Sequence, residues 1–99
     1  MKQTERESAT ALYRALCAGR EIVAHGEMRL LSVKDHMLKV VNGVDGLSVD
    51  YLTVVDCERL EEHETIQANS RLVGAIRLGS VRLLDNLSLD DASVELSTA

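Results

Sequence analysis

The chain has 99 residues, enough for one domain and too few for two ordinary ones, and its 45% apolar and 27% charged residues are typical of a folded domain. The net charge of -5 and an aromatic content of only two tyrosines argue against a protein that binds nucleic acid or anionic membranes, because those surfaces need a basic face. No signal peptide opens the sequence and no apolar run approaches the roughly 20 residues of a membrane span, so we expect one cytoplasmic domain over residues 1–99.

The first predicted element is a helix from about Glu5 to Ala24. Thr4 and Glu7 have the spacing of a capping box, and Gly26 follows as a stop signal. Apolar or small residues recur behind the cap at helical spacing, at Ala9, Leu12, Leu16, Gly19 and Val23. Gly19 costs a helix about 1 kcal/mol relative to Ala, unless it allows another part of the chain to pack close. A helix broken at Gly19 is the alternative.

A second helix is predicted from about Glu27 to Val41. Its apolar face is formed by Leu30, Val33, Met37 and Val40. Asn42-Gly43 ends it, and with Asp45-Gly46 predicts a loop, because Asn, Asp and Gly accept a positive φ at low cost.

The remaining chain predicts three strands. The β-branched segment Val49–Val55 reads as the first, and Asp56 follows in a position to cap a short turn. The polar, acidic segment Glu58–Asn69 predicts a loop. Two apolar runs, Arg71–Leu78 and Val81–Asn86, then predict a hairpin. The order of elements predicts an α+β domain, a two-layer sandwich with two helices packed on one face of a small three-stranded antiparallel sheet.

The hairpin connection fixes which residues face each other. Gly79 in the first loop position suits a two-residue type II′ turn, which places Arg77 opposite Arg82. One face is then apolar and should meet the helices; it carries Leu72, Gly74, Ile76, Leu78, Val81 and Leu83. Directly opposed like charges destabilise a sheet by some tenths of a kcal/mol unless an anion bridges them. The arginines therefore either extend into solvent or pair with Asp50, Glu58 or Glu61, or they contact an anion or a partner domain.

Cysteine and histidine spacing predicts no metal site. Cys17 and Cys57 form no CxxC pair, and the three histidines lack the i, i+4 spacing of metal ligands. His63 lies in the acidic segment Glu61–Glu64, where we expect a solvated loop histidine.

Two segments together resemble a known family. VDYLTVVD (residues 49–56) and LGSVRLLDN (residues 78–86) are similar to the carboxy-terminal domain of the pantothenate synthetase (pantoate–β-alanine ligase) family. ALYRAL (residues 11–16) and Gly26-Glu27 resemble the first helix of that domain and its end. The resemblance covers about residues 4–89. Gly74 and Ile76 depart from it, since the family leads us to expect a larger aliphatic residue followed by Ala on this core face.

The resemblance implies one part of an enzyme. The family condenses pantoate with β-alanine through pantoyl adenylate, using ATP and Mg²⁺. An amino-terminal nucleotide-binding domain with a His-x-Gly-His motif supplies the ATP and pantoate sites, and the carboxy-terminal domain closes over them as a lid. Neither that motif nor a Met-Ser-Ser-Arg-type segment occurs in this sequence. We therefore expect the chain alone to bind no cofactor and to show no ligase activity, with the amino-terminal domain as its partner.

The resemblance and the register together select candidate site residues. They are Arg77, Arg82, Asp85 and Asn86, as contacts at a domain interface or near the substrate, with no catalytic residue assigned. Asp85 and Asn86 have a structural alternative, in which they terminate the strand and bond free backbone amides. The alternative function is a stand-alone, non-catalytic regulatory or protein-interaction module, which binds a partner or forms a homodimer through its semi-apolar outer face.

Overall fold

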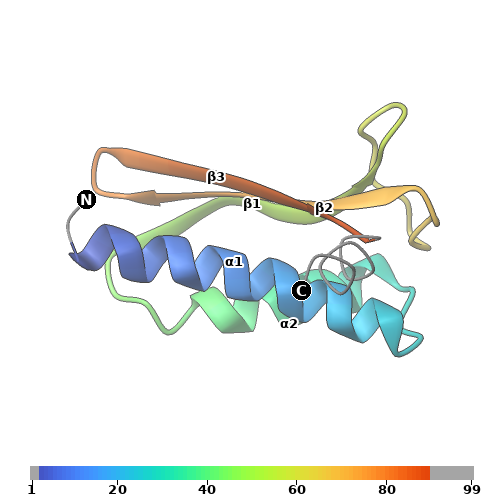
Figure 1. Cartoon of the computed structure of the whole chain (residues 1–99), viewed down its shortest axis with the longest axis horizontal. Helices are drawn as coiled ribbons and strands as arrows, with labels where there is room; N and C mark the ends of the chain where they lie inside the picture. The colour runs from blue at the N-terminus through green and yellow to red at the C-terminus, as the bar shows by residue number, and fades with distance from the viewer. Residues whose placement is uncertain (1–2, 90–99) are drawn as a thin grey trace, which may run out of the picture.

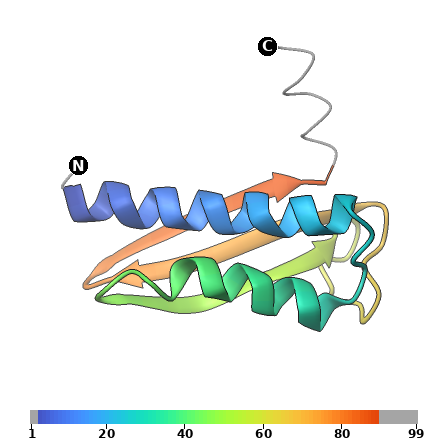
Figure 2. The ribbon, with the colours of Figure 1, turned by 90° about the horizontal axis from the view of Figure 1, so that it is seen from below.

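The computed structural model describes residues 3–89, with side chains from Arg6 onward. Two helices, α1 (Gln3–Ala24) and α2 (Leu30–Val41), precede three strands, β1 (Leu47–Asp56), β2 (Ser70–Leu78) and β3 (Val81–Ser88). The strands form one antiparallel sheet in the order β1-β2-β3. Both helices lie on the same face of the sheet, with α2 running back alongside α1 (Figures 1 and 2). The predicted two-layer α+β architecture is confirmed.

The first helix is continuous through Gly19, so the alternative with a break is wrong. A Cβ at Gly19 would lie 2.7 Å from both Leu72 Cδ2 and Met37 Sδ. The absence of a side chain therefore lets α1 approach β2 and α2 closely, and this packing offsets the poor helix propensity of glycine. The helix already includes Gln3, so Thr4 is not its N-cap.

The second helix begins at Leu30, three residues later than predicted. The segment before it is extended and pairs with the β1–β2 loop: Leu30 N donates to Glu64 O at 2.9 Å, and Ile66 N donates to Met28 O at 2.7 Å. Glu27 also accepts from the Arg29 amide at 3.0 Å. Tertiary hydrogen bonds thus replace the first predicted helical turn.

The hairpin register is confirmed. Arg77 lies opposite Arg82 and Leu78 opposite Val81, and Gly79 has φ 62°, as the first position of a type II′ turn requires. The two strands that flank β2 are longer than predicted. The strand β1 spans Leu47–Asp56 rather than Val49–Val55, and β3 continues past Asn86 to Ser88. Strand pairing extends these ends beyond the residues with strong β propensity.

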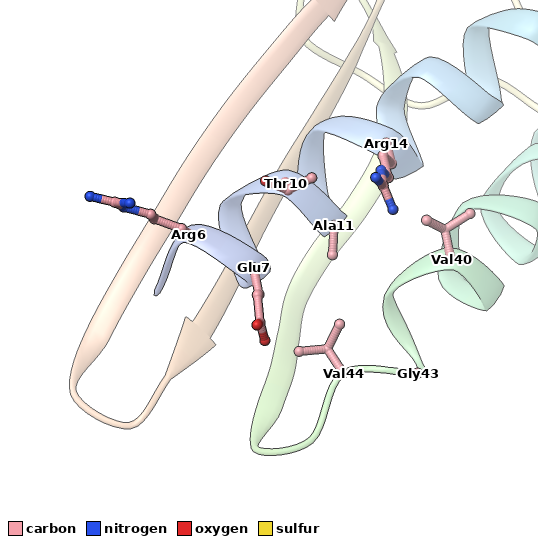
Figure 3. A pocket seen from close by; sticks show the side chains of 8 residues that line it. All are labelled: Arg6, Glu7, Thr10, Ala11, Arg14, Val40, Gly43 and Val44. Atoms are coloured by element: carbon pink, nitrogen blue, oxygen red, sulfur yellow. The ribbon is translucent and has the colours of Figure 1, made fainter. Parts of the chain in front are cut away.

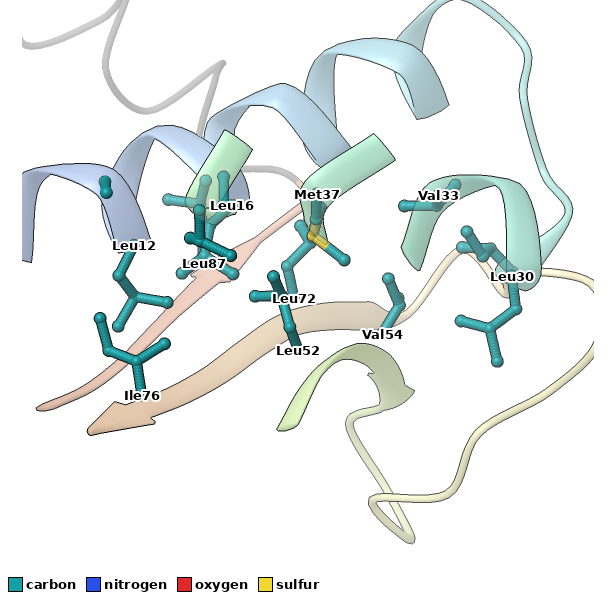
Figure 4. Packing of buried hydrophobic residues seen from close by; sticks show 14 residues of the cluster. Leu12, Leu16, Leu30, Val33, Met37, Leu52, Val54, Leu72, Ile76 and Leu87 are labelled. Atoms are coloured by element: carbon teal, nitrogen blue, oxygen red, sulfur yellow. The ribbon is translucent and has the colours of Figure 1, made fainter. Parts of the chain in front are cut away.

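The core fills the space between the helices and the inner face of the sheet, meaning the face turned toward the helices (Figure 4). Its fully buried side chains include Leu12, Leu16, Val33, Met37, Leu72 and Ile76. At Gly74 an added Cβ would lie 2.7 Å from Leu12 Cδ1 and 2.9 Å from Leu52 Cδ1. Leu12 and Leu52 therefore occupy the space that a larger aliphatic side chain, expected from the family resemblance, would need at position 74. Ile76, where Ala was expected, fills the adjacent core position.

Candidate functional site

The opposed arginines of the hairpin share one carboxylate. Arg77 Nε lies 3.0 Å from both oxygens of Asp50, and Arg82 Nε donates to Asp50 Oδ2 at 2.9 Å. All three side chains lie on the outer face, meaning the sheet face turned away from the helices. Of the alternatives for the two arginines, pairing with Asp50 is what the structure shows.

A β-bulge in β1 places Asp50 at this point. Val49 pairs with Ile76 and Tyr51 pairs with Ala75, so Asp50 is an extra residue without a partner on β2. In a regular strand Asp50 and Tyr51 would point to opposite faces; the bulge leaves both exposed. Asp50 was one of three acidic partners that the sequence offered, but nothing in the local pattern predicted the bulge.

The three charged groups leave a net charge of about +1 on this part of the outer face. Partial burial disfavours the ionised form of Asp50, yet the hydrogen bonds from Arg77 and Arg82 outweigh it, and the pKa of the carboxyl lies below its ordinary value. Among the described residues, Arg77 and Arg82 bind Asp50 through their Nε atoms, and no further acceptor contacts the terminal Nη groups.

Apolar side chains adjoin the charged cluster. Tyr51 of β1 and Leu84 of β3 flank Ala75 of β2 in one row across the sheet. Ala75 is fully buried, whereas Tyr51 is 42% and Leu84 is 62% exposed. Val73, in the next row, is half-buried. Large exposed apolar groups beside a paired charge cluster are typical of an interaction surface.

The four candidate residues from the sequence divide between the two faces. Arg77, Arg82 and Asn86 lie on the outer face, where Arg71 Nη1 donates to Asn86 Oδ1. Asp85 faces Gly74 in the register and therefore lies on the helix side, with its Oδ1 accepting from the Asn86 amide at 2.8 Å. The prediction that Asp85 and Asn86 terminate the strand is wrong, because pairing continues to Ser88.

The β1–β2 loop holds a second polar cluster that the sequence did not predict as such. The buried Asp56 carboxylate accepts from the Arg59 and Glu61 amides and from His63 Nε2, the last at 2.8 Å. The Arg59 amide, the His63 ring and, to a smaller extent, other loop amides outweigh desolvation and lower the pKa of Asp56 to about 2. The predicted turn capped by Asp56 is confirmed, but His63 is not merely a solvated histidine.

A carboxylate then joins the same loop to the rest of the fold. Glu62 accepts from the hydroxyl of Thr53 on the outer face of β1 and from Lys34 Nζ of α2 at 3.1 Å. These bonds hold the pKa of Glu62 below its ordinary value. The loop is therefore tied to both layers, an arrangement better suited to supporting the domain than to acid–base chemistry.

The helical layer carries an open groove between α1 and the end of α2 (Figure 3). Glu7 points toward Val44, and both residues line the groove. Within residues 3–89 we find no group of three or more His, Cys, Asp and Glu side chains arranged to hold a metal ion. No helix in that same range is long and apolar enough to cross a membrane.

Comparison with known proteins places this domain in one family. The family description "Pantoate-beta-alanine ligase" matches residues 1–88. The chain belongs to the pantoate–β-alanine ligase family. Pantothenate synthetase from Thermosipho melanesiensis is 34% identical over 87 residues, which are 88% of this chain and 31% of that protein. The Geobacter sulfurreducens pantothenate synthetase is 33% identical, with the same shares of the two chains covered.

The matching part of solved structures of family members has the same fold. The crystal structure of pantothenate synthetase from Thermus thermophilus matches with a TM-score of 0.81 and 30% identity. The match covers 90% of this chain and 32% of that chain. The chain therefore spans about a third of the length of the pantothenate synthetases that it matches.

Proposed function

We propose that this chain is the carboxy-terminal lid domain of a ligase that condenses pantoate with β-alanine to make pantothenate. The observation that carries the proposal is the family match over residues 1–88, combined with coverage of only 31% of the T. melanesiensis relative. The resemblance of residues 49–56 and 78–86 assigns the matched third to the carboxy-terminal end of the longer protein. The two free cysteines, Cys17 and Cys57, fit the cytoplasmic location expected for this enzyme.

In the proposed full enzyme, the pantoate carboxylate attacks the α-phosphate of ATP, which gives pantoyl adenylate and pyrophosphate. The amine of β-alanine then attacks the acyl carbon and displaces AMP. ATP and pantoate would bind mainly to the amino-terminal domain, because the family resemblance places their sites and the His-x-Gly-His motif there. The role left for this chain is to cover the site and exclude water from the reactive adenylate.

A domain replacement tests this proposal. The third of the T. thermophilus synthetase that this chain matches is exchanged for the chain itself, and AMP formation that depends on pantoate and β-alanine is measured. The T. thermophilus protein truncated before that third serves as the control. We expect the chimera to turn over well above the truncated protein and the 99-residue chain alone to be inactive. A folded chimera no better than the truncated control would contradict the proposal.

The exposed outer face favours a second candidate, a stand-alone module that binds a protein partner or a second copy of itself. Tyr51 and Leu84 form its apolar part, at 42% and 62% exposure. The two candidates differ in the size of the native polypeptide. An antibody raised against the chain should detect a band far above 10.9 kDa in source-cell extract for a ligase, and a band at 10.9 kDa for the separate module.

A further inference from the structure

The two faces of the sheet differ in what covers them. Both helices cover the inner face (Figure 1), whereas within residues 3–89 the outer face is covered only by the β1–β2 loop at one edge, through Thr53 and Glu62. Its central row, Tyr51–Ala75–Leu84, ends in two large, exposed apolar side chains. The next positions along the hairpin carry Arg77 and Arg82. The outer face is thus a continuous apolar and cationic surface.

Charge selects the chemistry of a partner for this surface. Asp50 balances one of the two arginines and holds both Nε atoms, at 2.9–3.0 Å. The pair keeps one net positive charge, and the Nη groups, which have no acceptor among the described residues, point to an acidic acceptor on the partner. Asp50 also restrains the two flexible side chains before any partner arrives, which lowers the entropic cost of binding.

The path of the chain indicates which part of the longer protein lies here. The helix α1 begins at the end of the molecule where the β2–β3 hairpin turns (Figure 1), and Glu7 and Ser8 line one depression with Leu78. A domain that precedes α1, as the proposed function requires, would enter at the hairpin end of the molecule, the end at which Arg77 and Arg82 lie. On the helical layer Leu31 is 79% exposed, but it lies at the start of α2, toward the opposite end of the molecule (Figure 2).

We infer that the outer face, formed by Tyr51, Leu84, Arg77 and Arg82, is the surface through which this domain meets the amino-terminal part of the ligase. The partner surface is apolar with an acidic group at its border, which accepts from the free Nη groups of the arginines. This inference rests on the proposed function and assigns the contact with the amino-terminal part to one face of the domain.

Thiol labelling distinguishes the two faces. In a background with Cys17→Ala and Cys57→Ser, a single cysteine is introduced as Leu84→Cys on the outer face or as Leu31→Cys on α2. The reaction rate with a maleimide is measured in the 99-residue chain and in the T. thermophilus chimera, with accessible cysteines of the T. thermophilus part replaced. We expect Leu84→Cys to react about tenfold more slowly in the chimera, and Leu31→Cys to react equally in both proteins.

The outcomes separate this inference from the proposed function. An active chimera in which Leu84→Cys stays as reactive as in the free chain overturns the inference and leaves the function standing. Equal slowing of both cysteines overturns it as well, because the contact would not be specific to the outer face. A folded but inactive chimera contradicts the proposed function, and its labelling pattern still decides whether the outer face is covered.

A charge variant and a natural protein complete the test. In the active chimera, Arg82→Ala should lower kcat/KM for AMP formation about tenfold, whereas Arg14→Ala, an exposed arginine on α1, should leave it unchanged. If the chimera does not fold, labelling is carried out on the T. thermophilus synthetase with cysteines at the positions aligned with Leu84 and Leu31. Equal and rapid labelling of both positions would overturn the inference.

Discussion

Leu12 of α1 packs against the bare backbone of Gly74 in β2, so closely that a Cβ on Gly74 would come within 2.7 Å of Leu12 Cδ1. Leu52 Cδ1 would be 2.9 Å from the same Cβ. Both leucines are buried and have little room to move. We predict that Gly74→Ala lowers the free energy of unfolding by about 1–3 kcal/mol through overpacking, measured by urea denaturation.

Gly43 provides the matched control for that variant. A Cβ at Gly43 would have nothing within 4 Å, so Gly43→Ala should be neutral or slightly stabilising. If Gly74→Ala is as neutral as Gly43→Ala, the close approach of α1 to the sheet is not present in solution.

Ser8 is fully buried in α1, and among the described residues its hydroxyl has no hydrogen-bond partner. Ser8→Ala removes the desolvated hydroxyl and adds helix propensity, so we expect the protein to gain about 1–2 kcal/mol of stability. Thr10→Ala, at an exposed position on the same helix, should give only the propensity part, about 0.5 kcal/mol. Equal gains from the two variants would mean that the Ser8 hydroxyl is satisfied in solution.

Asp50 changes the sign of the interaction between the hairpin arginines. In the wild-type chain Arg82→Ala removes a hydrogen bond to Asp50 and should destabilise the fold. In an Asp50→Ala background the same change removes repulsion from Arg77 directly opposite, and it should then be neutral or stabilising. A double-mutant cycle followed by thermal unfolding measures the difference. Additive effects of the two substitutions would show that the carboxylate does not couple the arginines.

Asp56 should contribute to the acid sensitivity of the domain. Its pKa lies at about 2 in the fold, below the reference value of 3.8, so the unfolded chain binds the proton more readily. The stability that Asp56 contributes is complete above about pH 3.8 and decreases as the pH falls toward 2. Asp56→Asn should therefore reduce the slope of unfolding free energy against pH in this window.

Other carboxylates also titrate in this range, so the expected result is a shallower slope rather than a flat one. Asp35→Asn is the control, because the ion pair that Asp35 makes with Lys39 on α2 is exposed. If the slope of unfolding free energy against pH is as steep in Asp56→Asn as in Asp35→Asn, the role assigned to the Asp56 carboxylate is contradicted.

Patterns in the sequence determined the fold class, the hairpin register and the family of this protein. The helical period of the first two segments, and the β-branched and apolar runs of the later ones, sufficed for the α+β class. The two-residue turn at Gly79 then placed Arg77 opposite Arg82. The paired segments at residues 49–56 and 78–86 sufficed for the family, which the match over residues 1–88 confirms. The helices, the strands and the turn depend on residues close together in the chain, whose spacing directly sets which face they share.

The tertiary structure alone decided how the candidate site is completed. Asp50 contacts Arg77 and Arg82, which follow it in the chain by 27 and 32 positions. The bulge that brings these side chains together depends on how β1 pairs with β2. The continuity of α1 through Gly19 depends on Leu72 and Met37, and the placement of Asp85 on the helix side depends on pairing that continues to Ser88. Propensity favours each local conformation by at most about 1 kcal/mol per residue, so packing and strand pairing between distant segments determine the outcome wherever the two disagree.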